Sequence, residues 1–405
     1  MTEHLRNRVV VVGIGVDGYE GLASAARTAI DGAGVVIGGA RQLELLPDSV
    51  KAERVVWPTP LRPAVQKLVE AHRDRGLVVL GSGDPMHHGI GRTLVEELGT
   101  LNVKVIPHPG SVSLACARMG WPVESTPVAS TLTAPLAGVL RHAGDGRHLL
   151  VLNRDAGTPA ELAALLTEAG FGGSRITVLS DLGGRERSLR GFADQADYWS
   201  SQAVGSVSIS AVEFAGAVAL PETQGLPDET FASDGQLTKR HVRAITLSTL
   251  APRPGELLWD IGGGSGSIAI EWLRAHASLR AICVEKDPVR AERVLANSAA
   301  LGVPTLEVVT GGAPDALAGL PTPDVIFVGG GLTAAGLFDT CWAALPAGGR
   351  FVTNAVTLES QALVTRLRAE HGGELVKIDV ARSTPVGAFT GWRAAMTVVQ
   401  WSVEK

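Results

Sequence analysis

Short apolar runs alternate with amphipathic, helix-length stretches along most of this 405-residue chain. In the second half, strand-like runs follow one another with helical segments between them, at 256–260, 281–284, 306–309, 324–328 and 350–353. Strands that alternate with helices predict an α/β fold with a mostly parallel, doubly wound sheet. The last two runs, 374–380 and 394–401, have no helix-length segment between them, so we expect an antiparallel final strand.

One of these runs ends in an acid and a glycine-rich turn. After Asp260 the chain breaks into Gly262-Gly263-Gly264-Ser265-Gly266 before the helical stretch 267–275. Residues without a Cβ let a ligand approach the backbone N–H groups at the carboxyl edge of a sheet. About twenty residues further on, the next strand ends in Glu285, whose carboxylate can accept hydrogen bonds from both hydroxyls of a ribose. The pattern predicts a site for a nucleoside-bearing cofactor.

The spacing of these glycines distinguishes between cofactors. A dinucleotide site has the pattern G-x-G-x-x-G, but Ser267 stands at the third glycine position and the observed pattern is G-x-G-x-G. This variant, between a strand that ends in Asp and one that ends in Glu, resembles the S-adenosylmethionine site of Rossmann-like methyltransferases. A nicotinamide site and a plain glycine-rich turn are the alternatives.

The first half also starts with a strand, a glycine turn and a helix. The run 9–12 leads to Gly13 and Gly15, and Gly18 completes a literal G-x-G-x-x-G. The next apolar run, 35–37, ends in two glycines without an acid for a ribose, so we reject a dinucleotide site here.

Two further segments of the first half continue this glycine-rich pattern. The run 77–80 leads into the loop 81–89, which contains an Asp84-Pro85 turn. The segment 107–113 leads into an alanine-rich helix that stops at Gly120. The periodic pattern is interrupted at 216–232 by two prolines, two glycines and several acids. We therefore expect a first domain at 1–215, a linker at 216–232 and a second domain at 233–405.

Composition limits the functional class and the compartment. Hydrophobic residues make up 45% and charged residues 19%, as in soluble α/β proteins, and the net charge of −5 gives no basic field for nucleic acid. Cys116, Cys283 and Cys341 are separate and in apolar settings, as expected for buried thiols of a reducing compartment. Without an apolar run of about 20 residues or a leader pattern, we expect a cytoplasmic protein with no membrane partner.

At these motifs the chain resembles two known families. The first half carries markers of the tetrapyrrole methylase family, namely the glycine turn at Gly13 and Gly15, the loop at 83–85 and the Pro-Gly-Ser-x-Ser segment at 109–113. The second half carries markers of the Rossmann-like decarboxylating precorrin methylases, namely the segment 234–240, the glycine turn at 262–266, Glu285 and the segment 328–331. The two modules in this order resemble the precorrin-6Y methyltransferase (decarboxylating) family of cobalamin biosynthesis.

This resemblance implies a bifunctional enzyme. The family methylates carbons 5 and 15 of a precorrin-6 type tetrapyrrole and decarboxylates the ring C acetate, giving precorrin-8. By resemblance, a class III methyltransferase domain at the N-terminus methylates carbon 5. A class I Rossmann-like domain at the C-terminus methylates carbon 15 and decarboxylates. Each domain is expected to bind one S-adenosyl-L-methionine, and relatives of both domains self-associate, which implies a homo-oligomer.

The resemblance also implies which residues bind the cofactor. In the first domain these are Gly13, Gly15, Gly81, Gly83, Asp84, Ser111 and Ser113. In the second domain they are Thr238, Asp260, Gly262, Gly263, Gly264, Ser265, Gly266, Glu285, Gly312 and Ala313. Two of these roles have alternatives, since Thr238 could instead be a helix N-cap and Asp260 could bind the ammonium group or simply hold the glycine turn.

Two segments depart from the family patterns. Relatives of the second domain usually carry Gly-Asp-Ala where this chain has Gly311-Gly312-Ala313, so an adenine contact would come from the backbone of Gly312 and Ala313. Many relatives of the first domain carry Ser-x-His-Gly-Arg where this chain has the segment 130–134, which contains neither His nor Arg.

The chemistry requires no dedicated nucleophile. A conjugated tetrapyrrole carbon is itself nucleophilic, so the enzyme must mainly position the reactants and exclude water. The catalytic residues are not identified by the sequence, but substrate carboxylates and proton transfer need cationic or acid/base partners. The candidates for these roles are His87, His88, Lys239, Arg240, His241, Arg243, Arg382 and Arg393, and no metal site is expected.

Three other functions compete with this interpretation. An oxidoreductase is disfavoured by the absent third glycine, and a non-catalytic S-adenosylmethionine sensor would not need two unrelated cofactor modules. A methyltransferase that acts on RNA or protein fits the second half alone, but the acidic net charge and the first half argue against it.

Overall fold

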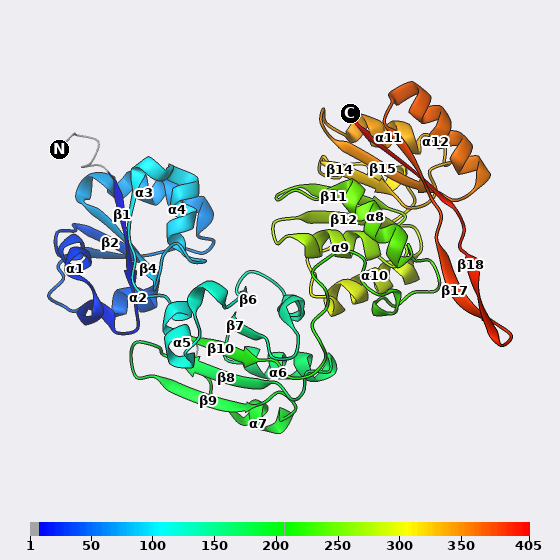
Figure 1. Cartoon of the computed structure of the whole chain (residues 1–405). Coiled ribbons are helices and arrows are strands. Elements are labelled where there is room, and N and C mark those ends of the chain that lie inside the picture. The colour runs from blue at the N-terminus through cyan, green and yellow to red at the C-terminus, as the bar shows by residue number, and fades with distance from the viewer. Residues whose placement is uncertain (1–7, 206) are drawn as a thin grey trace. The chain divides into compact units, whose positions relative to one another are not determined.

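The computed structural model describes residues 8–205 and 207–405, which form two compact units (Figure 1). The first unit contains the described residues up to Leu132 together with Gly146–Ala215. The second unit contains Thr133–Asp145 and Gly216–Lys405. An excursion of the chain in the first half therefore belongs to the second unit, which the local sequence pattern does not indicate.

The first unit contains two five-stranded sheets, with orders β3-β2-β4-β1-β5 and β6-β7-β10-β8-β9. The first sheet is entirely parallel, and the second is parallel only between β6 and β7. The elements are β1 Val9–Ile14, α1 Ser24–Asp31, β2 Val35–Gly38, α2 Ala40–Glu44, β3 Glu53–Val56, α3 Val65–His72, β4 Leu77–Ser82, α4 Ile90–Leu98, β5 Val103–Ile106, α5 Ser111–Met119, β6 Val128–Ser130, β7 His148–Leu152, α6 Thr158–Glu168, β8 Arg175–Ser180, β9 Arg187–Phe192, α7 Ala196–Ser201 and β10 Ser208–Glu213.

The second unit is a seven-stranded sheet of order β13-β12-β11-β14-β15-β19-β16 with a separate hairpin, β17-β18. Its elements are the 3₁₀ helix η7 Leu136–His142, α8 Arg240–Leu250, β11 Leu257–Ile261, α9 Ser267–Ala275, β12 Arg280–Glu285, α10 Pro288–Ala300, β13 Glu307–Thr310, β14 Val325–Val328, α11 Leu337–Ala344, β15 Arg350–Ala355, α12 Leu358–His371, β16 Glu374–Ile378, β17 Ala381–Val386, β18 Phe389–Ala394 and β19 Val398–Glu404.

The expected α/β fold and antiparallel final strand are confirmed. The strands β13, β12, β11, β14 and β15 are parallel, and β19 pairs antiparallel with both β15 and β16. The hairpin β17-β18 was not predicted, because its residues are mostly exposed and show no buried face. In Figure 1 it extends away from the sheet as a long two-stranded ribbon.

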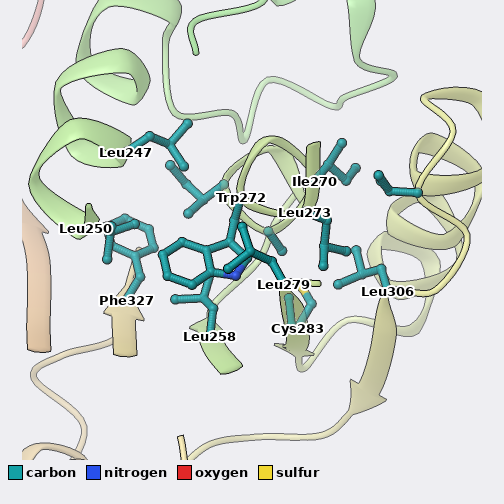
Figure 2. Packing of buried hydrophobic residues seen from close by; sticks show 14 of the residues in the cluster. Leu247, Leu250, Leu258, Ile270, Trp272, Leu273, Leu279, Cys283, Leu306 and Phe327 are labelled. Carbon is teal, nitrogen blue, oxygen red and sulfur yellow. The ribbon is translucent and has the colours of Figure 1, made fainter. Parts of the chain in front are cut away.

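The seven-stranded sheet has a hydrophobic core on each face. Successive residues of a strand point to opposite faces, so Leu258 packs with α8, α9 and α10 while Trp259 packs with α11 and α12. Figure 2 shows the first of these cores, where the fully buried Trp272 lies between Leu250, Leu258 and Leu279. Its indole N–H donates to the carbonyl of Arg280 at 3.0 Å, so the large ring is buried without an unpaired polar atom.

The segment 216–232, expected to be a linker, is part of the second unit. Leu226 and Phe231 are buried in the core on the α8–α10 face. The backbone N–H groups of Gly225 and Leu226 donate to the carboxylate of Glu271 on α9, at 2.5 and 3.1 Å. Its prolines and glycines make local turns in a packed strap, not a free connection.

The excursion 133–145 is anchored to the same unit. The guanidinium of Arg141 donates to the carbonyls of Leu273 and Arg274, at 3.3 and 2.8 Å. These carbonyls belong to the last turn of α9, where a cation is favoured by the orphan carbonyls. A Cβ on Gly302 would overlap the backbone of Arg141, so the two segments are in close contact.

Candidate active site

The glycine turn after β11 lies where loops of the neighbouring strands meet. The strand order reverses between β11 and β14, and crevices at such reversal points are the usual ligand sites of open α/β sheets. Gly262, Gly264 and Gly266 have φ values of +76°, +61° and +76°, which favour glycine. A Cβ on Gly263 would overlap Sγ of Cys283 on β12. Conformation and space therefore both require the glycines that the sequence singled out.

Glu285 holds this turn through its carboxylate. It is 4% exposed, and its Oε2 accepts from the N–H of Gly264 at 2.8 Å while Oε1 accepts from the N–H of Asp287 at 3.0 Å. A carboxylate has about four lone-pair sites, so two remain for ribose hydroxyls. Asp287 is the N-cap of α10, as the sequence predicted, and its side chain accepts from Val289 and Arg290.

Ser265, in the same turn, has a buried hydroxyl without a partner. It is 1% exposed, and its Oγ has no hydrogen-bond partner among the described residues. Because a buried hydroxyl normally forms a hydrogen bond, an unpartnered one beside bare backbone fits a site that a polar ligand completes. The glycine cradle and this hydroxyl together fit the predicted cofactor.

Asp260 lies behind the turn. It is 1% exposed, and its Oδ2 accepts from the N–H of Ala269 in the first turn of α9 at 3.1 Å. Burial raises the pKa of this carboxyl to about 7, the hydrogen bond from Ala269 opposes the rise, and the charge of Glu285 adds to it. Of the two roles considered for Asp260, the observed contact is the one that holds strand, turn and helix together.

A loop at 234–238 covers the glycine turn. A Cβ on Gly264 would lie 3.0 Å from the carbonyl of Gln236. Asp234 fixes the loop to α10 through ion pairs with Arg290 at 2.8 Å and Arg293 at 3.1 Å. The hydrogen bond from Arg290 lowers the pKa of the Asp234 carboxyl well below its usual range.

Arg243, a candidate substrate partner, is wholly buried. Its side chain is 0% exposed and pairs with Glu271 at 2.6 Å and with Asp228 at 3.2 Å. The guanidinium also donates to the carbonyls of Leu226 and Thr238 and lies over the ring of Phe231, 4.8 Å from its centroid. These contacts use four of its five N–H donors, and the side chain is wholly buried, so Arg243 has a structural position between α8, α9 and the covering loop.

Thr238 is not the N-cap of α8. The N-cap is Lys239, which makes no side-chain capping bond, so this alternative for Thr238 is wrong. Its carbonyl is held by Arg243 at the start of the helix. The cofactor contact of Thr238 remains a prediction.

The other basic candidates of this unit are exposed. Lys239 is the N-cap of α8, and Arg240 and His241 lie in its first turn, beside the covering loop. Arg382 and Arg393 face each other across the hairpin β17-β18, and Arg382 is 3.8 Å from the carboxylate of Asp228. Because β16 runs parallel to β15, the hairpin that follows β16 begins at the same carboxyl edge as the glycine turn.

Two further loops reach this edge. After β13, the N–H of Gly311 donates to the carbonyl of Glu285 at 2.9 Å, which places Gly312 and Ala313 beside the end of β12. Gly312 is exposed, and no atom lies within 4 Å of a Cβ built on it. After β14, Gly330 lies against Gly262, with its carbonyl 3.1 Å from a Cβ built there.

The first unit brings a second set of glycines together. Gly13 on β1 is in register with Gly81 on β4, and the N–H of Gly83 donates to the carbonyl of Ile14 at 2.9 Å. A Cβ on Gly13 would overlap the carbonyl of Gly83, so the two loops touch through bare backbone. The predicted glycines of this unit therefore gather at the carboxyl edge of one sheet.

Asp84 shapes the loop after β4. Its Oδ1 accepts from the N–H of Met86 at 2.9 Å, and its carbonyl accepts from the N–H of His87 at 3.1 Å. His87 and His88 are exposed, and their rings meet edge to face with centroids 4.8 Å apart. Burial lowers the pKa of His88, and His87 adds to this.

The third loop at this edge precedes α5. Ser111 is the first residue of α5 and Ser113 lies in its first turn, exposed. A Cβ on Gly83 would lie 3.0 Å from Cα of Gly110, so the start of α5 adjoins the loop of Asp84. The sequence did not single out His108 in this loop or Asp17 after β1, whose side chains approach to 3.2 Å. Polar residues within a few positions of a strand end were the available signal.

Three further features concern the cysteines, the residues that could bind a metal and the length of the apolar helices. The three cysteines are free and buried, as predicted. Across 8–205 and 207–405, no group of three or more His, Cys, Asp or Glu could hold a metal ion. In the same ranges no helix is long and apolar enough to span a membrane.

Comparison with known proteins separates the chain into two matched regions. Residues 8–197 match the family described as tetrapyrrole (corrin/porphyrin) methylases, and residues 229–405 match the precorrin methyltransferase domain. The chain is 45% identical over 400 residues to the precorrin-6Y C(5,15)-methyltransferase [decarboxylating] of a Sinorhizobium species, covering 98% of this chain and 96% of the relative. The chain belongs to this family.

A second relative and a solved domain structure are also named as precorrin-6Y methyltransferases. The precorrin-6Y C(5,15)-methyltransferase of Mycobacterium tuberculosis (strain ATCC 25618 / H37Rv) is 45% identical over 400 residues, covering 98% of this chain and 100% of the relative. A crystal structure of the C-terminal domain of the Rhodobacter capsulatus precorrin-6Y C5,15-methyltransferase is 48% identical and covers 46% of this chain and all of that domain, with a TM-score of 0.44. Membership of the precorrin-6Y methyltransferase family thus rests on 45% identity over nearly the whole chain.

Proposed function

We propose that this protein methylates carbons 5 and 15 of a precorrin-6 type tetrapyrrole and decarboxylates its ring C acetate, in cobalamin biosynthesis. The observation that carries this proposal is the identity of 45% over 98% of the chain to decarboxylating precorrin-6Y C(5,15)-methyltransferases. The chain contains both methylase regions, with the tetrapyrrole methylase region first and the precorrin methyltransferase region second.

The second unit is the proposed site of methylation at carbon 15 and of decarboxylation. S-adenosylmethionine supplies an activated methyl group when it is bound. The turn at 262–266 would lie against its methionine part through backbone that carries no Cβ, the hydroxyl of Ser265 would gain its missing partner, and Glu285 would accept from the ribose. Glu285 also holds the N–H of Gly264, so it couples ribose binding to the shape of the turn.

The first unit is the proposed site of methylation at carbon 5, with a second S-adenosylmethionine. Its edge offers the bare backbone of Gly13, Gly81 and Gly83 and the helix start at Ser111. It has no acid at the end of β2, which ends in Gly38. The ribose in this unit would therefore be held by backbone groups and by side chains near Asp84, and not by a carboxylate in the position of Glu285.

The exposed cations near the carboxyl edge of the seven-stranded sheet are the proposed partners of the substrate carboxylates. Lys239 and Arg240 at the start of α8, and Arg382 and Arg393 on the hairpin, present guanidinium and ammonium groups to solvent. Carboxylates bind such groups through charge-assisted hydrogen bonds. Arg243 is not part of this set, because its side chain is wholly buried and paired with Glu271 and Asp228.

The hairpin β17-β18 also supports a homo-oligomer. Val386, Phe389, Trp392 and Met396, at or next to its strands, are 61%, 82%, 80% and 70% exposed. A group of large apolar side chains left open in this way is typical of surfaces that associate. Replacing Phe389 and Trp392 together by Ser should lower the molar mass in solution, measured by light scattering.

The function is tested by incubating the protein with a precorrin-6 substrate and S-adenosylmethionine. The product should gain the mass of two methyl groups and lose that of carbon dioxide, and two equivalents of S-adenosylhomocysteine should form. Glu285→Gln should abolish the decarboxylation and one methylation while the other methylation persists. Unchanged substrate, or tight binding of NAD instead of S-adenosylmethionine, would contradict the proposal.

A further inference from the structure

A carboxylate and an imidazole, neither of them among the predicted cofactor residues, meet at the carboxyl edge of the first sheet. Asp17 follows β1, and His108 follows β5, which lies next to β1 in the sheet. His108 Nε2 is 3.2 Å from Asp17 Oδ1, and the two side chains are 11% and 29% exposed. The pair is therefore mostly withdrawn from water, at the edge where the glycine loops meet.

The surrounding backbone leaves room for this pair. A Cβ on Gly15 would lie 2.7 Å from Nε2 of His108 and would overlap the Asp17 carboxylate. A Cβ on Gly21 would also overlap that carboxylate. Two glycines therefore leave open the volume that the carboxylate and the ring occupy.

Asp17 has few other partners. Its Oδ1 is buried and has no well-aligned hydrogen bond within the described residues. The nearby imidazole of His108 is therefore the group that can compensate the charge of this oxygen. A buried carboxylate oxygen without an N–H donor is costly, and the cost falls when the facing ring carries a proton on Nε2. Asp17 thus favours the ring tautomer in which Nε2 carries the proton and Nδ1 has a free lone pair.

The other ring nitrogen is available. The contact with Asp17 uses Nε2 of His108 and leaves Nδ1 outside the ion pair. The backbone N of His108 lies 2.7 Å from a Cβ built on Gly13, which places the residue against the glycine that faces Gly81. His87 and His88 are less suited to a sheltered proton transfer, because both are exposed on the loop after β4.

We propose that His108, positioned by Asp17, accepts the proton released when the first unit methylates its substrate, an inference that rests on the proposed function. The substrate carbon forms a bond to the methyl carbon, and the C–S bond breaks with its electron pair moving to sulfur. The substrate carbon then loses its hydrogen as a proton, whose bonding pair returns to the conjugated ring. That proton passes to Nδ1 of His108, and Asp17 balances the positive charge of the ring.

The test uses His108→Ala in the full chain, with the second unit as an internal control. This variant should slow the methylation at carbon 5 by about 10²- to 10⁴-fold, the range expected for a lost general base. An intermediate that has gained one methyl group and lost carbon dioxide should accumulate at the wild-type rate. If the wild-type protein makes neither product, the proposed function fails. If His108→Ala completes both methylations at the wild-type rate, this inference alone fails.

Two further measurements separate proton transfer from structural support. Added imidazole should restore part of the carbon 5 methylation in His108→Ala, because it can fill the vacated space and accept the proton. Asp17→Asn should lower kcat with little change in KM for S-adenosylmethionine, and imidazole should not restore it. His72→Ala, on α3 at the opposite edge, is the matched control and should have no effect. Loss of S-adenosylmethionine binding in His108→Ala, or no rescue by imidazole, would overturn the proton-accepting role.

Discussion

Deeply buried arginine–carboxylate pairs distinguish the described part of the second unit from that of the first. In the second unit the ion pairs Arg243–Glu271 and Arg350–Glu256 have side chains at most 14% exposed. In the first unit the pairs Arg62–Glu96, Arg75–Glu53 and Arg118–Glu186 have side chains between 28% and 61% exposed. Buried pairs hold packed segments in a fixed arrangement, while exposed pairs contribute little to stability.

The same contrast holds at the glycine-rich edges. In the second unit the turn rests on two buried acids, Asp260 and Glu285, and its glycines contact side chains as well as backbone. In the first unit the loops touch through backbone, at Gly13 and Gly83, and the acid at the edge faces a histidine. A strand followed by a glycine turn is therefore supported in two different ways within this chain.

The largest expected effect comes from breaking a buried pair. Arg243→Met should destabilise the second unit by roughly 3–5 kcal/mol, because Glu271 stays buried without its cation. The matched change Arg118→Met, in a two-pronged but exposed pair with Glu186, should cost about 1 kcal/mol or less. Hydrogen exchange read by mass spectrometry reports each unit separately. Equal effects of the two changes would remove the contrast between the units.

The second prediction concerns which glycines can be rescued. Gly263→Ala should destabilise the second unit by roughly 1–3 kcal/mol through overlap with Cys283. Cys283→Ala in the same chain should remove most of that penalty, because the obstacle is a side chain. Gly13→Ala in the first unit meets backbone at Gly83, so we expect no such rescue there. Thermal unfolding of the single and double variants measures the coupling, which should be absent if the turn relaxes freely.

A pH profile tests the buried acid. The pKa of Asp260 is about 7 in the folded protein against 3.8 as the ordinary value, so the folded state binds more protons between these limits. Its contribution to stability is full below about pH 4 and is lost as the pH rises through about 7, with a slope of at most about 1.4 kcal/mol per pH unit. Asp260→Asn should flatten this part of the profile for the second unit. The same slope in both proteins would show that Asp260 does not titrate there.

The smallest effect expected is a gain of affinity. Gly312 stands where relatives of the second domain usually carry Asp, and a Cβ there meets no atom within 4 Å. Gly312→Asp should tighten S-adenosylmethionine binding in the second unit about several-fold, as one added hydrogen bond of about 0.5–1.5 kcal/mol would. Gly312→Asn, of the same size but uncharged, is the control. Calorimetric titration measures both, and a weaker site in Gly312→Asp would place the adenine elsewhere.

Local pattern predicted most of the fold and the second glycine turn. The strand–glycine–helix segment at β11 and α9, the acid after β12 and the N-cap at Asp287 all depend on neighbours in sequence. The hairpin β17-β18 was missed, because its side chains are exposed on both faces and show no hydrophobic periodicity.

Long-range contacts could not be predicted in this way. Arg243 belongs to a basic run at the start of a helix, and nothing local shows that it faces Glu271, although an acid within the apolar stretch 267–275 was a signal. The strap at 216–232 contains turn residues, yet Leu226 and Phe231 enter the core. The approach of Asp17 to His108 depends on the pairing of β1 with β5, two strands that lie far apart in the sequence.

The central claim is that each unit holds its own S-adenosylmethionine. Calorimetric titration of the full chain with S-adenosylhomocysteine measures the number of sites directly. We expect two equivalents per chain in the wild-type protein and one equivalent of unchanged affinity in Glu285→Gln. A single equivalent in the wild-type protein, or none, would contradict the claim.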